Sequence, residues 1–272
     1  MVQVIIISFE YTENRLLGSI FDLYKVYSHF KKLNYNIHIY TDIIYNYIYF
    51  DYKYLDNIKN KNNRIRDFID LICRQTTEPY NKYNFLKKIK NDIIKDDKYF
   101  IYYSGHGIDG KLLLPSFEKI DFNDFIYEII KSIKDYSQIF ILLDCCKIGD
   151  VHMTFKFDNK ILKYHYDIYY PHCIYIMTTS SSNEDSLSTQ NGSLFTKYFF
   201  KEHKIYEFNY IIEYIQNEII MDALNIKNKI EIPTISIYCS YINHPILWLW
   251  IFIDNLNIIP DYSLSNIYLQ LN

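Results

Sequence analysis

Two stretches decide how this chain folds, Tyr102-Tyr103-Ser104-Gly105-His106-Gly107 and Leu142-Leu143-Asp144-Cys145-Cys146-Lys147-Ile148-Gly149. Each stretch closes an apolar, strand-like segment and ends in a reactive side chain, a histidine in the first and a cysteine in the second. If the two strands are parallel neighbours, their carboxyl ends bring an imidazole and a thiol to the same sheet edge. A cysteine hydrolase needs this pair of groups.

Apolar runs alternate with helical spacings on both sides of these two stretches. Strands are expected at six places, which are 2–8, 37–41, 98–103, 138–143, 173–177 and 233–239, with a short β extension at 111–114. Helices are expected at 16–33, 64–72, 82–94, 121–133, 194–202 and 211–224. The segments 42–63, 151–172 and 178–193 show no clean period and are interpreted as loops or irregular chain. This alternation predicts an α/β fold with a mainly parallel sheet and helices on both faces.

The composition is that of a folded chain with a packed core. Of the 272 residues, 49% are hydrophobic and 22% are charged, which argues against global disorder. The net charge of -3 and the lack of a basic stripe argue against a nucleic-acid partner. The longest apolar run, 246–253, is too short for a membrane span.

The cysteines indicate a reducing compartment. There are five, and two of them are adjacent, which argues against a disulfide scaffold. We therefore expect a cytoplasmic protein. No linker divides the chain, so residues 1–242 are expected to form one domain, with the tail 243–272 packed on it.

The residues at the two strand ends carry the chemistry. A thiol is mostly protonated at neutral pH, and a nearby imidazolium stabilises the thiolate. We expect His106 to supply that charge and to protonate the leaving amine as general acid. The N–H groups of Gly107 and Cys146 would form a two-donor oxyanion hole. For each residue taken alone, the alternative is a structural histidine and an inert buried cysteine.

These residues resemble the metacaspase branch of the caspase-fold cysteine peptidases, a group that comprises caspases, metacaspases and paracaspases. That family carries Ser-Gly-His-Gly at its third strand and Asp-Cys/Ser-Cys-x-x-Gly at its fourth, as do Ser104–Gly107 and Asp144–Gly149 here. In the family the second residue of the pair is the nucleophile, so the resemblance assigns that role to Cys146 and the general acid/base role to His106. It also implies a caspase-like three-layer sandwich around a six-stranded, mainly parallel sheet.

Weaker matches extend the resemblance along the chain, with interruptions, from Val2 to about Ser240. The segment Leu16-Leu17-Gly18-Ser19-Ile20-Phe21-Asp22 is similar to the family's first-helix pattern Leu-x-Gly-Cys-x-x-Asp. Metacaspases cut after Arg or Lys, and two aspartates of the family motifs form the acidic S1 pocket. The matching residues are Asp22 and Asp144, and Ser104 would line the same pocket.

The calcium site of the family is altered in this chain. Many metacaspases hold calcium with aspartates after the histidine motif and beyond the cysteine. Asp121 and Asp124 are retained, but Pro115-Ser116-Phe117 stands where the family has Pro-x-Asp, and Met153 stands seven residues past the nucleophile. Because calcium takes six or more oxygen ligands, we expect the site to be absent or crippled, and we expect no cofactor.

Together with the motifs, the resemblance thus implies a calcium-independent cysteine endopeptidase that cleaves peptides or proteins after Arg or Lys. The segment 151–172, with Lys156, Lys160 and Lys163, is a candidate for self-cleavage. Lys147-Ile148 replaces the His-Ser that usually follows the nucleophile, which leaves open a catalytically weak or inactive caspase-like regulator. A flavodoxin-like or Rossmann module is disfavoured, because no Gly-x-Gly-x-x-Gly loop follows the first strand.

Overall fold

The computed structural model describes residues 2–50, 55, 63–73, 80–93, 96–158, 161–180, 184–201, 208–226 and 234–240. The tail 243–272, expected to pack on the domain, and Lys160 lie outside these residues. Among the residues that the structure describes, no helix has the length and apolar character needed to cross a membrane.

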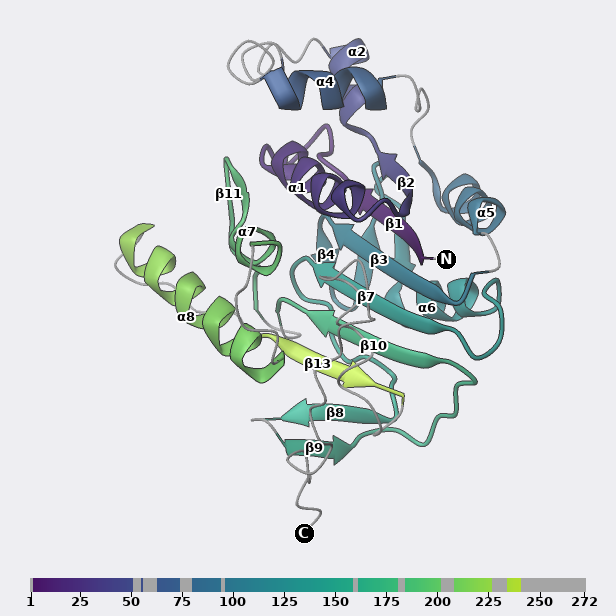
Figure 1. Cartoon of the computed structure of the whole chain (residues 1–272). Coiled ribbons are helices and arrows are strands. Elements are labelled where there is room, and N and C mark those ends of the chain that lie inside the picture. Colours follow the sequence, from purple (N-terminus) through teal and green to yellow (C-terminus); the bar gives the residue numbers. More distant parts are fainter. Residues whose placement is uncertain are drawn as a thin grey trace.

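An eight-stranded sheet forms the centre of the molecule (Figure 1). Its order is β2 (Asn36–Thr41), β1 (Val2–Ser8), β3 (Lys98–Ser104), β7 (Gln138–Asp144), β10 (Cys173–Thr178), β13 (Ser236–Cys239), β8 (Phe155–Asp158) and β9 (Ile161–Tyr164). Neighbours among the first five strands are parallel, and the last three strands are added antiparallel. The six strands expected from the sequence are all present, and the mainly parallel central sheet is confirmed.

The sheet separates two hydrophobic cores, which makes the molecule three layers thick. Along β1, Val4 and Ile6 belong to one core, whereas Ile5 and Ile7 belong to the other. Successive side chains of a strand point to opposite faces, so a strand covered on both faces is apolar throughout. This is why the short run from residue 2 to residue 8 could be identified as a buried strand.

Helices cover both faces of the sheet (Figure 1). Those that contribute to the core of Val4 are α1 (Ser19–Lys32), α2 (Ile43–Phe50), α4 (Asn63–Ile72), α7 (Leu194–Phe199) and α8 (Phe208–Ile226). Those that contribute to the core of Ile5 are α5 (Lys82–Asp92) and α6 (Phe122–Ile130). The helices expected from apolar spacing are confirmed, with ends that differ by a few residues.

Two expectations were wrong in part. The segment 42–63 was expected to be a loop, but α2 begins at Ile43. Its sequence, IIYNYIYF, has no charged residue to mark a solvent face, so no helical period is visible. Ile43 and Ile44 are fully buried and Ile48 is exposed, so tertiary packing decides this helix rather than a polar stripe.

The segment 151–172 was expected to be irregular, but it contains the β8–β9 hairpin. Lys156 pairs directly with Lys163 across this hairpin, and the ammonium of Lys156 lies 5.1 Å from the centre of the Tyr238 ring in β13. Strands of four residues that carry lysine give a weak alternating pattern, which explains the error. The hairpin extends the six expected strands to eight.

Two small sheets follow the main strands and shape the candidate site. One consists of β4 (Gly107–Ile108), β5 (Lys111–Leu113) and β6 (Lys119–Asp121), which includes the expected β extension at 111–114. The other is the hairpin of β11 (Ser188–Thr189) and β12 (Gly192–Ser193), inside a segment expected to be a loop.

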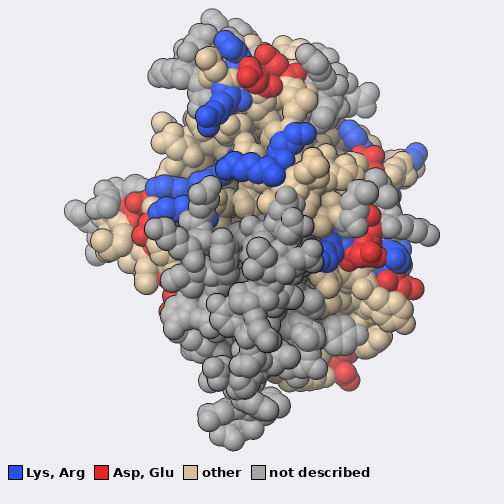
Figure 2. All heavy atoms as spheres, in the orientation of Figure 1, with Lys and Arg blue, Asp and Glu red and all other residues tan. Residues whose placement is uncertain are grey.

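The surface shows a local gathering of charge (Figure 2). Lys and Arg side chains form a band across the face that is shown, over α1, which carries Lys25, Lys31 and Lys32. The side chain of Lys25 is held in place, because its ammonium donates a hydrogen bond to the carbonyl oxygen of Lys197 in α7 at 2.7 Å. This lysine therefore contributes to the packing of α1 against α7.

Candidate active site

The carboxyl ends of β3 and β7 lie side by side. The two strands pair in parallel, with Ser104 opposite Asp144, so His106 and Cys146 each follow the aligned residues by two positions. The chains also touch beyond the strands, because a Cβ placed on Gly107 would lie 1.9 Å from the carbonyl oxygen of Cys146. The structure thus brings the histidine motif and the cysteine motif to one sheet edge, and only glycine fits at residue 107.

The segment after β1 holds the imidazole of His106. Its Nε2 lies 2.6 Å from the carbonyl oxygen of Asn14, and its ring lies 4.6 Å from the Tyr11 ring, centre to centre. Because a carbonyl only accepts, Nε2 must carry the proton, which leaves Nδ1 of the neutral ring as the basic nitrogen. Sequence reasoning missed both contacts: a backbone carbonyl has no side-chain signature, and Tyr11 is one of 30 tyrosines.

Cys146 is half-buried beneath the segment 184–186. Its Sγ accepts a hydrogen bond from the N–H of Ser186 at 3.2 Å, and Lys147 N–H donates to the Glu184 carbonyl at 3.1 Å. Burial raises the pKa of the Cys146 thiol, the Ser186 N–H lowers it, and Asp185 raises it further. On balance these surroundings favour the protonated thiol of Cys146 over the thiolate.

The neighbouring Cys145 is enclosed by protein. Its side chain is 1% exposed, and burial raises its pKa well above the usual value. The hydroxyl of Ser180 donates to the Cys145 carbonyl at 2.7 Å, which connects Cys145 to the segment that follows β10. Cys145 thus has neither the access nor the acidity of a nucleophile, whereas Cys146 is partly accessible.

Asp22 and Asp144 form a buried acidic pair. Asp22 lies on α1 and accepts the N–H of Ser193 with both oxygens, at 2.9 and 3.0 Å. Burial raises the pKa of Asp22 well above its usual value, and the charge of Asp144 raises it further. Gly192 makes the contact possible, since a Cβ there would lie 2.3 Å from an Asp22 oxygen.

Asp144 is held by three hydroxyl groups. Thr196 donates to it at 2.6 Å, Ser186 at 3.1 Å and Thr179 at 3.3 Å. Burial raises the pKa of Asp144, and the nearby hydroxyl groups of Ser193, Thr196, Ser186 and Thr179 oppose the rise. Within the described ranges, neither aspartate forms an ion pair.

Ser104 closes the same buried region. It is 5% exposed and stands opposite Asp144, and Tyr102, two residues earlier on β3, shares a hydrogen bond with Thr196 at 2.7 Å. All three residues expected to line S1 therefore gather around β3, β7 and the start of α1. Each is less than a tenth exposed, so all three side chains are shielded from solvent in this structure.

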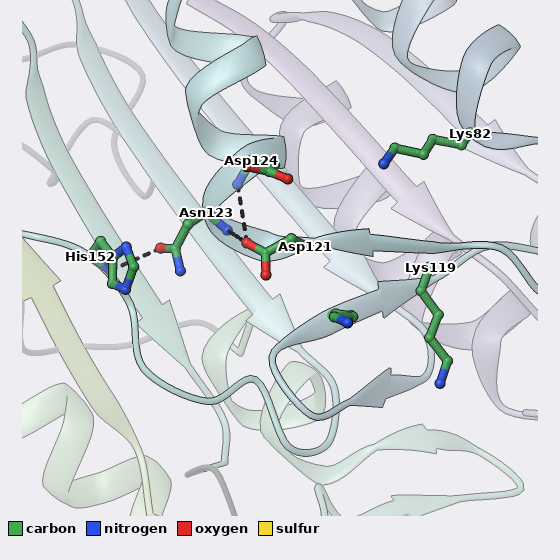
Figure 3. Close-up of a pocket in the computed structure, with 7 residues that line it drawn as sticks. Lys82, Lys119, Asp121, Asn123, Asp124 and His152 are labelled. Atoms are coloured by element: carbon green, nitrogen blue, oxygen red, sulfur yellow. Dashed lines mark hydrogen bonds between the residues drawn. The ribbon is translucent and has the colours of Figure 1, made fainter.

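The two aspartates of the expected calcium region lie elsewhere, in an open cavity of about 520 Å³ (Figure 3). The cavity is lined by Lys82, Lys111, Lys119, Asp121, Asn123, Asp124 and His152. One oxygen of Asp121 caps α6 by accepting the N–H groups of Asn123 and Asp124. No group of three or more metal-binding side chains occurs among the residues described.

The fold of the chain is similar to that of a solved protein, the caspase-1 from Spodoptera frugiperda. The two chains share 11% sequence identity with a TM-score of 0.52, over 86% of this chain and 87% of that one. No protein-family model and no curated protein sequence matches the chain. The similarity confirms the caspase-like α/β fold, and the metacaspase assignment stays a prediction from the motifs.

Proposed function

We propose that this protein is a cysteine endopeptidase of metacaspase type that cleaves peptide bonds after Arg or Lys without calcium. The observation that carries the proposal is the alignment of β3 with β7, which brings the His106 and Cys146 segments into contact at the carboxyl edge of a caspase-like sheet. In this proposal Cys146 is the nucleophile and His106 the general acid/base.

The hydrogen bond of His106 to Asn14 supports the role of His106 as general base for Cys146. With the proton on Nε2, the free Nδ1 can take the proton of the Cys146 thiol during attack. Because burial raises the pKa of that thiol, the thiol stays protonated in the resting enzyme and loses its proton only as it attacks the substrate.

The reaction then follows acyl transfer. The Cys146 sulfur bonds to the substrate carbonyl carbon while the carbonyl electrons move to oxygen, where the N–H groups of Gly107 and Cys146 would stabilise the charge. Collapse breaks the C–N bond as His106 returns its proton to the leaving amine. Water, deprotonated by His106, releases the acyl group and restores the thiol.

The acidic pair supports selection of a basic P1 side chain. A buried carboxylate without a cation is costly, and a guanidinium supplies up to five N–H donors to such acceptors. A bound Arg would replace the serine and threonine donors that now hold Asp22 and Asp144. Substrate entry therefore requires Ser186 to leave Asp144, which would also uncover the Cys146 sulfur.

The cavity around Asp121 and Asp124 supports calcium independence (Figure 3). Lys82, Lys111 and Lys119 line the same space, and their ammonium groups would repel a divalent cation. Asp121 is already used as a helix cap. These residues do not fit a calcium ion, and no catalytic step is assigned to one.

Turnover of a fluorogenic peptide with Arg at P1 tests the proposal. We expect Cys146→Ala and His106→Ala each to abolish turnover and Cys145→Ala to retain it, because Cys145 is enclosed. Calcium and a calcium chelator should leave the rate unchanged. A rate that survives Cys146→Ala would overturn the assignment of the nucleophile.

A second candidate is a caspase-like regulator that binds partners without turnover. The raised pKa of Cys146 and the closed acidic pair favour it. Wild-type protein that cleaves neither Arg nor Lys peptides, with or without calcium, would support the regulator.

Two finer points belong to the same proposal. The five cysteines form no disulfide, which supports a cytoplasmic location.

Self-cleavage within 151–172 would require the β8–β9 hairpin to open, because Lys156 and Lys163 lie in its paired strands. A fragment pattern by mass spectrometry that is the same in Cys146→Ala would remove the self-cleavage idea.

A further inference from the structure

We propose that Tyr11 and Asp42 are positioning residues that fix the ring of His106 in its working orientation and tautomer. This inference rests on the proposed peptidase function. It concerns the segment from residue 9 to residue 16, which joins β1 to α1 and supplies both contacts to the imidazole.

Tyr11 contacts His106 in two ways. Its ring packs against the imidazole with centres 4.6 Å apart and planes tilted by 36°. Its hydroxyl accepts the backbone N–H of His106 at 2.8 Å and donates to the Leu113 carbonyl at 2.8 Å. The fully buried Tyr11 thus restrains both the backbone and the side chain of the general acid/base.

The backbone of this segment is held in an unfavourable conformation. Tyr11 and Asn14 have φ values of 67° and 49°, in the left-handed region that side chains other than glycine rarely occupy. Such a conformation persists only where the surroundings impose it. Asn14 is the residue whose carbonyl meets Nε2 of His106, so the conformation bears directly on the ring.

Asp42 imposes this conformation from the end of β2. One oxygen accepts the N–H of Glu10 at 2.7 Å, and the other accepts the N–H of Tyr11 at 2.8 Å. Asn46, on α2, donates to the second oxygen at 3.0 Å and fixes the carboxylate in turn. Asp42 is 1% exposed, so these bonds are sheltered from water.

The segment is also closed on itself. The N–H of Leu16 donates to the Glu10 carbonyl at 3.0 Å, and Arg15 forms an ion pair with the Glu10 side chain. Asp42 therefore holds Glu10 and Tyr11 in place, and the backbone leads from Tyr11 to Asn14, whose carbonyl meets the imidazole. Loss of the Asp42 carboxylate should release the Asn14 carbonyl from Nε2 and let the ring change its tautomer.

Nitrogen NMR of protein labelled with ¹⁵N-histidine tests this chain of contacts, with His106→Ala to assign the signal. We expect wild type to hold the proton on Nε2, and Asp42→Asn to show a mixture of tautomers. Tyr11→Phe keeps the ring but loses the hydroxyl, and we expect it to lower kcat roughly tenfold with little change in KM.

Tyr40→Phe is the matched control. Tyr40 is equally buried, but its hydroxyl donates to Asp92 at 2.8 Å rather than to the histidine motif. It should lose stability like Tyr11→Phe but keep the wild-type kcat and His106 signal. A Tyr11→Phe protein with the wild-type kcat and His106 signal would overturn the inference.

The two proposals fail separately. A wild-type protein without turnover ends the peptidase proposal, while the His106 tautomer still reports on Tyr11 and Asp42. If Asp42→Asn does not fold, the Tyr11→Phe comparison remains decisive, because that change keeps the shape of the core.

Discussion

At the scale of single residues, the reactivity of Cys146 is set by the segment that covers it. The N–H of Ser186 favours the thiolate, whereas burial and the Asp185 carboxylate favour the thiol. Lys147 forms an ion pair with Asp185 at 3.7 Å, so this lysine partly neutralises the charge of Asp185.

We expect Asp185→Asn to lower the pKa of Cys146, because it removes a negative charge beside the sulfur. The rate of alkylation by iodoacetamide at pH 7 should rise severalfold, since only the thiolate reacts. Asp109→Asn, the same change of charge on an exposed loop, is the control. Equal rates for Asp185→Asn and wild type would show that Asp185 does not act on the thiol.

The buried Asp22 makes stability depend on pH. Its carboxyl ionises near 3.8 in the unfolded chain but at higher pH in the folded protein, because burial and the charge of Asp144 favour the protonated form. The stability that the protonated group contributes is complete below the unfolded pKa and is lost as pH rises through the folded pKa.

Asp22→Asn stays neutral at every pH, so it should be more stable than wild type at pH 8 and similar to it near pH 4. At about 2–4 °C of Tm per kcal/mol for a domain of this size, we expect a gain of several degrees at pH 8. Asp67→Asn, on the exposed face of α4, should show no such divergence. Parallel Tm curves for Asp22→Asn and wild type would contradict the assignment of a raised pKa.

At the scale of elements, the close approach of the segments that follow β3 and β7 depends on Gly107. A methyl group at this residue would collide with the Cys146 carbonyl, which belongs to the backbone and cannot rotate away. At Gly110 the nearest atom would be 3.3 Å from a Cβ, and the cost is mainly that of its φ of 76°.

Gly107→Ala should therefore lower the free energy of unfolding by more than about 2 kcal/mol and abolish turnover. Gly110→Ala should cost about 1 kcal/mol, the strain of a left-handed alanine. Urea denaturation measures both. A Gly107→Ala protein as stable as Gly110→Ala would show that the two strand ends can separate without loss.

The sequence predicted those elements whose pattern is set by burial. The apolar runs of β1, β3 and β7 are buried on both faces, and the two motifs at their ends located His106 and Cys146 correctly at one edge. It could not predict the contact of His106 with Asn14, because that contact depends on the path of the backbone. The sequence also could not predict that Asp22 and Asp144 are buried and hydrogen-bonded, because their hydrogen-bond donors come from the distant segment 179–196.

At the scale of the whole molecule, every described strand lies between residue 2 and residue 239. One domain over 1–242 and a tail 243–272 packed on it stay predictions. If its apolar run 246–253 packs on the domain, a chain that ends at residue 242 should still unfold cooperatively but with a lower Tm.

A chain that ends at residue 254 keeps the apolar run and should retain the wild-type Tm in calorimetry. The pair of truncations separates packing of the apolar run from an effect of chain length. Identical Tm values for both would mean that the run contributes nothing to stability, and loss of cooperative unfolding in the shorter chain would move the domain boundary.

The position of the β8–β9 hairpin has a consequence for biosynthesis. Among the strands that the structure describes, the hairpin pairs with the rest of the sheet only through β13, yet 71 residues, 165–235, separate it from that strand along the chain. During synthesis, the edge of β10 that pairs with β13 therefore stays unpaired until β13 leaves the ribosome. The β8–β9 hairpin also lacks its neighbouring strand until then. Because open edges recruit other chains, a nascent protein stalled before residue 236 should be a target for chaperones.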